Sequence, residues 1–506
     1  MERKLWKWLQ ENADTEFGKA HHFQEIKNIS DYRKFVPLSD YSDYEDAINR
    51  MYAGEKQVLT AYPLYCFVTT SGSIGKPKKI PLTREGLAPF ADCYDNVMKH
   101  VKGVPGKHLH LSVFPTIPGL PDREMLVSAA AYRYLFEKGI FDPDCYVGGR
   151  EFMFSKERGS IFYVKLWMAF YEESLLSIQS AYLYDVLLFF EYMAEWGERM
   201  LIHMEKREIP EEIEITDAVR EKLLTEFCPS GGRIHFLRRE LKQGYTGIAS
   251  RIWRNLRMIS GIGGSFFKTR EELLRQFTGD IPYHYFLYGS SECLSAYADG
   301  LENSYYTLLP DSGFFEFLDR ETGEVYTINE VQEQKKYELV VTNRSGLYRY
   351  LQGDILRVAE FRKGVPVFEI MGRIHQVLNV AGEKTDAAML EETALRFAKR
   401  WGIELHEYAV TVDAVRYPAG YVFYLEPAWE KPDGSGTELA RSFDCILREV
   451  NPDYDDLRNL QYLGMPRVIC LEKGDLIRRT KYRNQSHNKP GQPILHRFGR
   501  EGDPHA

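Results

Sequence analysis

The segment TSGSIGKPKK, residues 70–79, lies between the apolar runs LYCFVT (64–69) and IPL (80–82). Glycines let a backbone approach a phosphate closely, and successive N–H groups can form a nest that binds an anion. The GxxxxGK[ST] spacing of a P-loop is absent. The segment predicts a phosphate-binding loop between two strands, with a plain polar hairpin as the alternative. The residues predicted to hold the phosphates are Thr70, Ser71, Gly72, Ser73, Gly75 and Lys78, with Lys79 as an alternative to Lys78.

A second motif, Tyr288-Gly289-Ser290-Ser291-Glu292, follows the strand-like run YHYFL. A carboxylate at the end of a strand can ligate Mg²⁺ beside phosphates. The tyrosine ring can stack on a nucleotide base. The motif therefore predicts a nucleotide site with Glu292 as its metal ligand, and a strand-terminating turn is the alternative.

Two further motifs follow along the chain. In LYRYLQGD, residues 347–354, an ionised Asp354 beside a glycine turn can accept hydrogen bonds from both ribose hydroxyls. The alternative is an ordinary Gly-Asp hairpin turn. In GRIHQVLNVAGEK, residues 372–384, Arg373 lies where we expect a hinge, so it can change its phosphate contacts as a small domain moves. A charged linker is the alternative there.

The chain has 506 residues, which is too many for one compact core, so we expect at least two domains. Short runs rich in β-branched and aromatic residues predict many strands over 313–370, followed by a small α+β unit. We place the boundary near Gly372, which gives domains 1–372 and 373–506. Residues 160–204 carry apolar positions at three- and four-residue spacing, which predicts two long amphipathic helices.

Composition excludes several classes of protein. A formal net charge of −8 argues against a non-specific nucleic-acid binder, which needs a basic surface. The seven cysteines are dispersed without a CxxC pair, so we expect reduced thiols in a cytoplasmic protein and no zinc site. The N-terminus lacks the apolar core of a signal peptide. The most apolar stretch, 175–196, contains Gln179, Asp185 and Glu191, so we expect a buried helix and not a membrane span.

Taken together, the four motifs resemble the adenylate-forming superfamily of acyl-CoA synthetases, luciferase-type enzymes and peptide-synthetase adenylation domains. Their order matches that superfamily's [ST]SG[ST]-G-PK loop, Y-G-x-[ST]-E, G-D and G-R hinge. Within it, the chain most resembles the auxin-responsive acyl acid–amido synthetase family. The segments that carry this closer resemblance are YGSSE, TEFGK at 15–19, Val36-Pro37 with Tyr41 and Tyr44, the aromatic helices before YGSSE, and GEKT at 382–385.

The resemblance implies an α/β fold, with a large N-terminal adenylate-forming domain of mixed sheets and helices and a small mobile C-terminal α+β domain. It implies ATP and Mg²⁺, an acyl-AMP intermediate and transfer of the acyl group to an amine, usually of an amino acid. Glu292, Arg373 and Lys384 are the implied catalytic residues. Ile262, Gly263 and Gly264, with the aromatic helices, are expected to line the acid pocket. We expect a monomer or weak oligomer that acts on small molecules.

Two departures from the family pattern stand out. Cys293 follows Glu292 where the family usually has glycine, and Ile494 stands where the family's G-Q-x-K-x-P-R stretch has a lysine aimed at the acyl phosphate. Lys481 and Lys489 lie nearby at different spacing. Three functions are therefore weighed: an amide-forming ligase, which we favour; an adenylating enzyme that delivers its acyl group to a thiol of CoA or a carrier protein; and a degenerate nucleotide-binding homologue.

Overall fold

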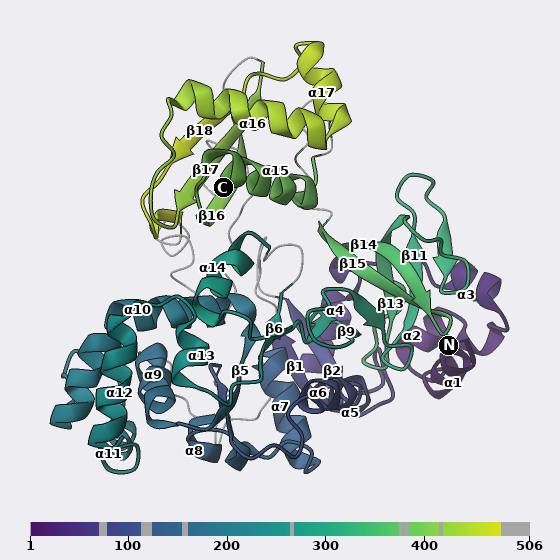
Figure 1. Cartoon of the computed structure of the whole chain (residues 1–506). Helices are drawn as coiled ribbons and strands as arrows, with labels where there is room; N and C mark the ends of the chain where they lie inside the picture. The colour runs from purple at the N-terminus through teal and green to yellow at the C-terminus, as the bar shows by residue number, and fades with distance from the viewer. Residues whose placement is uncertain are drawn as a thin grey trace. The chain divides into compact units, whose positions relative to one another are not determined.

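The computed structural model describes residues 2–69, 78–112, 124–153, 160–263, 268–373, 378, 383, 385–413 and 418–476 (Figure 1). The chain divides into two compact units. The first unit comprises Met1–Ile262, Arg275–Gln352 and Arg357–Glu369, and the second comprises Gly263–Leu274, Gly353–Leu356 and Ile370–Ala506. Among the described residues, no helix is both long and apolar enough to cross a membrane.

The first unit begins with short helices whose ends follow from their capping residues. These are α1 (Glu2–Glu11), α2 (Glu16–Ala20), α3 (Ile29–Phe35) and α4 (Tyr41–Tyr52). Thr15 caps α2 by accepting the N–H of Gly18, and a Cβ on Gly18 would lie 2.1 Å from the carbonyl oxygen of Asn12. Asp40 begins α4 with a capping box. The TEFGK segment therefore begins with a helix N-cap at Thr15. It then places Gly18 so close to the backbone of Asn12 that a side chain would not fit.

The strand–loop–strand prediction is confirmed on both sides of the loop. Strand β1 (Leu64–Thr69) pairs antiparallel with β2 (Lys79–Thr83) and parallel with β4 (Glu124–Met125). The helices α5 (Arg84–Leu87), α6 (Phe90–Met98) and α7 (Val127–Glu137) follow β2 or β4 along the chain. The predicted loop residues 70–77 lie outside the described residues.

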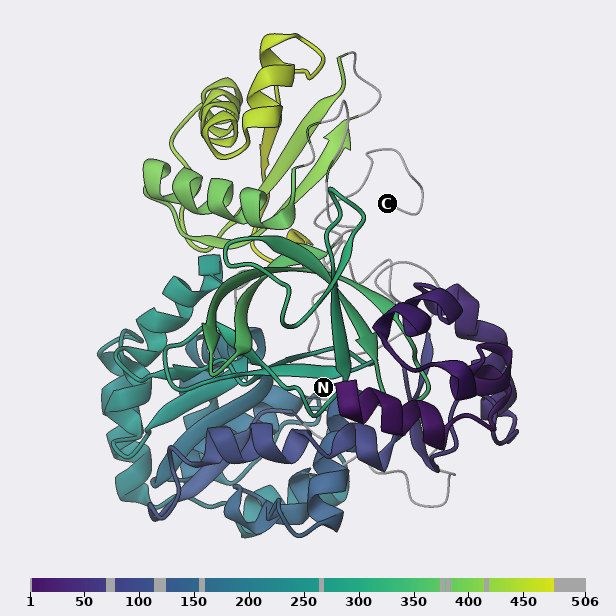
Figure 2. The ribbon, with the colours of Figure 1, turned by 90° about the vertical axis from the view of Figure 1, so that its right-hand side faces the viewer.

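A parallel four-stranded sheet has the order β3-β5-β6-β7. Its strands are β3 (Lys107–His110), β5 (Leu175–Tyr182), β6 (Met258–Ile262) and β7 (Tyr283–His284). Figure 2 shows the helices that flank it. They include α8 (Gly149–Met153), α9 (Ile161–Tyr171), α10 (Leu183–Lys206), α11 (Asp217–Thr225), α12 (Gly231–Lys242), α13 (Ile248–Ile252) and α14 (Lys268–Thr278).

The two helices predicted over 160–204 are present as α9 and α10, but the strand between them was not predicted. Between α9 and α10 the chain forms β5, an inner strand of this sheet, so the buried helix expected near 175–196 is a strand over Leu175–Tyr182 and a helix only from Leu183. A parallel strand buried on both faces is a continuous apolar run, and periodicity alone does not separate such a run from a buried helix.

An eight-stranded sheet has the order β12-β11-β13-β14-β15-β10-β9-β8. It belongs to the first unit except for Gly353–Leu356 of β14 and the end of β15 from Ile370, which belong to the second. The many strands predicted over 313–370 are confirmed. In chain order the eight strands are β8 (Leu287–Gly289), β9 (Leu294–Ala298), β10 (Tyr306–Leu308), β11 (Phe314–Leu318), β12 (Val325–Thr327), β13 (Lys336–Thr342), β14 (Tyr350–Arg362) and β15 (Val365–Arg373).

The second unit contains the predicted α+β element order. Its sheet is β16-β17-β18, formed by β16 (Leu405–Asp413), β17 (Gly420–Pro427) and β18 (Arg467–Cys470). The accompanying helices are α15 (Ala387–Trp401), α16 (Gly436–Val450) and α17 (Pro452–Asn459), of which the sequence prediction lacked α17. The rings of Phe423 and Phe443 stack at 4.2 Å in its core.

A buried carboxylate ties the end of the described chain to this sheet. Glu426 on β17 is paired with His406 on β16, with 2.6 Å between Oε1 and Nδ1. The same carboxylate accepts the backbone N–H groups of Gly474 at 2.7 Å and Leu476 at 3.0 Å. We call these four residues the Glu426 clasp.

Candidate active site

Glu292 lies on a tight turn between β8 and β9, and Ser290 shapes that turn. The Ser290 hydroxyl oxygen accepts the N–H groups of Glu292 at 3.2 Å and Cys293 at 3.3 Å. The N–H of Ser290 donates to the carbonyl of Cys293 at 2.9 Å. A Cβ on Gly289 would lie 3.2 Å from that same carbonyl oxygen, so the close pairing at the start of the turn favours glycine.

Strand β14 holds this turn through side chains that alternate along it. Tyr350 Oη donates to Glu292 Oε1 at 3.2 Å, and Gln352 Nε2 donates to Ser290 Oγ at 3.2 Å. Tyr350 and Gln352 are two residues apart on a strand, so their side chains share a face. Asn343 Nδ2 donates to the Glu292 backbone carbonyl at 2.7 Å. The backbone and the carboxylate of Glu292 are thus both held by side chains from or directly after other strands of the same sheet.

The Tyr350 hydroxyl keeps its proton and therefore acts as a hydrogen-bond donor at any physiological pH. Burial raises the pKa of Tyr350, and the nearby Glu292 carboxylate raises it further. The phenol therefore stays protonated over the whole physiological range, and the proton in this hydrogen bond belongs to the tyrosine. The phenol therefore orients the Glu292 side chain as a hydrogen-bond donor.

The N-terminal segment Ser39–Tyr41 lies against the same strand. Ser39 N donates to the Arg349 carbonyl at 3.1 Å, and Leu351 N donates to the Ser39 carbonyl at 2.8 Å. Two residues later, Tyr41 Oη accepts the N–H of Lys79 at 3.1 Å. The VP-x-x-x-Y segment therefore joins β14 to the strand that follows the phosphate loop.

The two lysines after the predicted loop differ in their surroundings. Lys79 Nζ forms an ion pair with Glu124 at 3.1 Å and lies 3.5 Å from the ring centroid of Tyr52. Lys78 Nζ lies 5.1 Å from the ring centroid of Tyr41. The Ser42 hydroxyl, which is the main cause, and the Lys78 charge both lower the pKa of Asp40. Lys79 is thus paired with a protein carboxylate, and phosphate binding by Lys78 stays a prediction.

Asp354 and Tyr288 are both buried. Asp354 lies inside β14 and is 4% exposed, so the Gly353-Asp354 pair is part of a continuing strand and does not form a hairpin turn. Gly353 has a φ of 75°, which favours glycine and interrupts the regular strand geometry. The Tyr288 ring meets Phe368 edge-on, with 5.8 Å between ring centroids. Its stacking on a base stays a prediction, as does the ribose contact of Asp354.

The remaining predicted residues divide by position. Ile262 is the last residue of β6 and is partly buried against the core of the first unit, with Gly263 directly after it. Arg373 is the last residue of β15. The predicted residues that lie outside the described part of the chain are Thr70, Ser71, Gly72, Ser73, Gly75, Gly264 and Lys384.

The structure adds residues that the motif analysis did not assign. Tyr350 and Gln352 lie inside the LYRYLQGD motif. Their two-residue spacing with Asp354 could have predicted that the three side chains share one face of a strand. Tyr41 was noted only as part of a family signature. No local pattern marks Asn343, because its role depends on the pairing of strands distant in the sequence.

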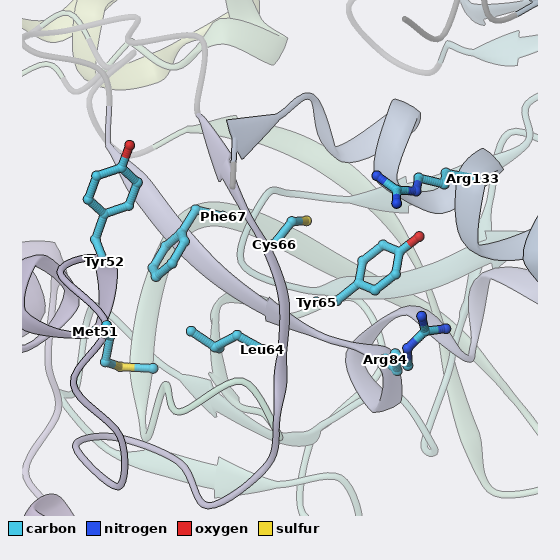
Figure 3. A pocket seen from close by; sticks show the side chains of 9 residues that line it. Met51, Tyr52, Leu64, Tyr65, Cys66, Phe67, Arg84 and Arg133 are labelled. Atoms are coloured by element: carbon cyan, nitrogen blue, oxygen red, sulfur yellow. The ribbon is translucent and has the colours of Figure 1, made fainter. Parts of the chain in front are cut away.

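A separate cavity of about 450 Å³ lies along β1, the strand that leads into the predicted loop (Figure 3). Arg84 and Arg133 flank the ring of Tyr65 there, with guanidinium carbons 4.7 and 5.7 Å from its centroid. Both arginines pair with Glu137, at 2.9 and 3.1 Å, and Tyr65 Oη donates to the same carboxylate. None of the predicted site residues lines this cavity.

Solved structures share this fold over almost the whole chain. The structure described as AtGH3.15 acyl acid amido synthetase in complex with 2,4-DB superposes with a TM-score of 0.84 at 22% identity, covering 98% of this chain and 90% of that one. A 2-hydroxyisobutyryl-CoA ligase in the postadenylation state superposes at 0.57 with 12% identity, covering 93% and 85%. These likenesses confirm the expected α/β adenylate-forming fold, with a large N-terminal and a smaller C-terminal part.

Sequence relatives and family models agree with the fold. Indole-3-acetic acid-amido synthetase GH3.6 of Arabidopsis thaliana is 28% identical, over 88% of this chain and 79% of that protein. Indole-3-acetic acid-amido synthetase GH3.8 of Oryza sativa subsp. indica is 27% identical, over 84% and 75%. The N-terminal, central and C-terminal domain models of the GH3 family match residues 1–283, 306–373 and 388–492. The resemblance to acyl acid–amido synthetases is thereby confirmed, and the chain belongs to the GH3 family.

Proposed function

We propose that this protein is an ATP-dependent acyl acid–amido synthetase, a ligase that converts a carboxylic acid to an acyl-AMP and transfers the acyl group to an amine, usually that of an amino acid. Membership of the GH3 family supports the reaction class. The observation that carries the assignment to this chain is the Glu292 turn. Its carboxylate is oriented by Tyr350, in the same unit as the lysines that follow the predicted phosphate loop.

Mg²⁺ fits the residues present. Among the described residues, no three His, Cys, Asp or Glu side chains gather to hold a metal. Mg²⁺ is typically held by one or two carboxylates together with substrate phosphates and water, so a single carboxylate suffices. Glu292 Oε1 accepts one hydrogen bond from Tyr350 and the carboxylate retains further lone pairs. Glu292 would hold the ion, which would neutralise phosphate charge when bound.

The first half-reaction is an in-line attack of a carboxylate on the α-phosphate, between two anions. Such a step needs charge neutralisation and alignment of the reactants. We assign phosphate binding to the loop residues 70–75 with Lys78, and ribose binding to Asp354. Ile262, Gly263 and Gly264 line the acid pocket. In the second half-reaction the amine attacks the acyl carbon of acyl-AMP, and AMP leaves as a stable anion.

Arg373 and Lys384 complete the proposed site. Both precede α15 of the second unit, and the proposed boundary after Gly372 makes Arg373 the first residue of the smaller domain. A basic residue at such a hinge can exchange phosphate contacts between half-reactions as the domain moves. We place the enzyme in the cytoplasm as a monomer or weak oligomer that acts on small molecules and binds neither nucleic acid nor membrane.

Two assays test the function in sequence. Pyrophosphate exchange with a panel of carboxylic acids detects adenylation, and mass spectrometry after adding either amino acids or CoA identifies the acceptor. We expect exchange with at least one acid, and amides but not thioesters as products. Thioesters alone would support the thiol-delivering alternative. ATP binding without exchange on any acid would support the degenerate homologue.

A further inference from the structure

Lys165 lies in the middle of α9, a helix that is buried on every side. Its neighbours Val164, Leu166 and Trp167 are each at most 2% exposed, and Lys165 itself is 1% exposed. A helix that is apolar all round belongs to the interior of a domain, where lysine is rarely found without a partner. The position therefore needs an explanation beyond packing.

The Lys165 ammonium has no counter-ion in the part of the chain that the structure describes. Its Nζ is buried and makes no hydrogen bond to any described residue. Burial lowers the pKa of Lys165 to about 8, so it still carries its charge near neutral pH. An unpaired buried cation costs several kcal/mol, since its water shell is lost without replacement. Retaining one is typical of a site that awaits an anion.

His110, at the carboxyl end of β3, lies within reach of the Lys165 charge and belongs to a group of polar side chains at the ends of β3 and β5. Burial chiefly, and the Lys165 charge in addition, lower the pKa of His110 to about 3, so this imidazole is neutral. His110 ends β3, and its Nδ1 accepts the N–H of Ser112 at 3.2 Å. Ser112 Oγ lies 3.2 Å from Ser180 Oγ, which donates to Asp185 at 2.7 Å. In parallel sheets, ligands bind beyond the carboxyl ends of the strands.

This cluster adjoins the predicted acid pocket. Tyr182, at the end of β5, pairs with Ile262, at the end of β6. A Cβ on Gly261 would lie 2.8 Å from the backbone of Leu183, so the two strand ends are in close contact. Strand β6 also contacts β8, which leads into the Glu292 turn. Consider an acid bound at Ile262 whose reacting carboxylate points toward Glu292. The rest of that acid would then lie beside the carboxyl ends of β3 and β5.

We propose that Lys165 is a specificity-determining residue which pairs with a second carboxylate on the acyl acid, so that the enzyme activates dicarboxylic acids in preference to monocarboxylic acids. This inference rests on the proposed function. The second carboxylate supplies the counter-ion that α9 lacks, and its own desolvation is offset by the ion pair. The Ser112 hydroxyl offers one hydrogen bond to its remaining lone pairs, whereas the Ser180 hydroxyl already donates to Asp185.

The experiment compares matched pairs of acids in the pyrophosphate-exchange assay, each pair having the same carbon chain with one or two carboxylates. Wild-type protein should favour the diacid by at least about 100-fold in kcat/KM, since leaving a buried charge unpaired costs about 3 kcal/mol or more. Lys165→Met removes the charge at similar volume. It should lose most of that preference while keeping exchange with the monoacid. Lys242 is an exposed lysine on α12, and Lys242→Met is the control. It should change neither the diacid preference nor the rate of exchange with the monoacid.

Stability of the free protein gives a second readout. Lys165→Met should raise the melting temperature in the absence of acid, because an uncompensated charge is replaced by an apolar side chain. If Lys165 had a structural role, Lys165→Met would instead lower the melting temperature. Binding of the diacid should raise the melting temperature of wild type more than that of the variant.

Three outcomes would overturn the proposal. The first is equal activation of both acids by wild type. The second is an unchanged diacid preference in Lys165→Met. The third is an effect confined to the KM of the amino acid in the second half-reaction, which would assign Lys165 to the acceptor's carboxylate. Absence of exchange with every acid, mono- or dicarboxylic, would instead count against the proposed function itself.

Discussion

The Glu292 carboxylate is the side chain on which the proposed chemistry depends most directly. Glu292→Gln keeps the shape of the side chain, and its amide oxygen can still accept from Tyr350, but the charge that would hold Mg²⁺ is gone. We expect pyrophosphate exchange to fall to background while the melting temperature stays within about 1–2 °C, since surface-accessible isosteric changes cost little stability. Glu360→Gln, an exposed glutamate on β14 paired with Arg362, is the matched control. Full exchange by Glu292→Gln would refute the metal assignment.

Tyr350 acts through Glu292 and is a positioning residue. Tyr350→Phe removes only the hydroxyl that donates to Glu292. Groups that orient a metal ligand typically contribute about 10- to 100-fold in metal affinity or activity. We expect the Mg²⁺ concentration for half-maximal exchange to rise by about that factor, with a smaller change at saturating Mg²⁺.

Tyr283→Phe provides a control for the loss of a buried tyrosine hydroxyl. Its hydroxyl lies 2.6 Å from Thr278 Oγ1 in the same unit, and Tyr283 is no part of the proposed site. An unchanged Mg²⁺ requirement in Tyr350→Phe, or the same increase in Tyr283→Phe, would show that the hydroxyl does not position the ligand.

Asp185 makes the stability of the first unit depend on pH. Burial raises the pKa of Asp185 from 3.8 to about 7, although the hydrogen bond from Ser180 opposes the shift. A carboxyl group with a raised pKa favours the folded state while protonated, and this contribution is lost as pH rises from about 4 to about 7. Asp185→Asn should therefore gain stability over wild type as pH rises through that range, by at most about 4 kcal/mol.

Urea denaturation at pH 4.5, 6 and 8 measures the difference between wild type and Asp185→Asn. Asp280→Asn, at an exposed position in the same unit, should show no such trend. A difference that is constant across the three pH values would mean that Asp185 is ionised in the folded protein throughout.

At the scale of elements, the sequence was most informative where turn and cap residues limit the alternatives. The strands on either side of the glycine loop, the strands of 313–370 and the elements of the second unit other than α17 follow the prediction. Strand β5 does not, because an inner parallel strand and a buried helix are both continuous apolar runs. Helix α17 was missed because its eight residues are mostly polar and only Tyr454 is buried.

A buried ion cluster fastens the N-terminal helices to the large sheet. Glu316 on β11 accepts from Arg349 Nε at 2.8 Å and from Arg33 Nε on α3 at 2.9 Å. Glu316 is 1% exposed and Arg349 4% exposed, with Arg349 in a left-handed conformation at φ 49°. Glu316→Gln would leave a buried guanidinium group without its counter-ion, which typically costs about 3–5 kcal/mol.

The midpoint of urea denaturation measures this loss, and a two-state transition must be verified for a chain with two units. Glu321→Gln, an exposed neighbour on the same unit, is the control and should differ from wild type by less than about 0.5 kcal/mol. A loss below 1 kcal/mol in Glu316→Gln would show that the cluster orients the helices without adding net stability.

For the whole molecule, the motifs identified the family but only part of the site geometry. Glu292 and Asp354 were assigned from short motifs, and the structure gives Glu292 its partners Tyr350 on β14 and Asn343, which directly follows β13. Asn343 reaches Glu292 only because the intervening strands fold back beside β8 and β9. Long-range pairing of this kind leaves no local signature. Lys165 was overlooked for another reason: in sequence it is one charged residue in an apolar run.

One departure from the family pattern, Ile494 in the C-terminal segment, bears directly on the rate of acyl-AMP formation. Ile494 stands where the family has a lysine, and removing one preorganised stabiliser of transition-state charge costs about 10²–10³ in rate. Under single-turnover conditions, Ile494→Lys should accelerate acyl-AMP formation if the position is vacant. Lys489→Ala should slow it if Lys489 has taken over the role, with Lys481 the next candidate. If neither change alters the rate of an active enzyme, the tail has no part in adenylation.

The Glu426 clasp limits how far from β17 a later lysine of the chain can lie. Gly474 and Leu476 are hydrogen-bonded to a buried carboxylate, so Leu476 is a fixed point of the chain. Lys481 is five residues and Lys489 thirteen residues past Leu476. At about 3.6 Å per fully extended residue, their backbones lie at most about 18 Å and about 47 Å from that point. A phosphate contact by Lys481 therefore requires a site near β17, whereas the covalent limit for Lys489 allows a site much farther away.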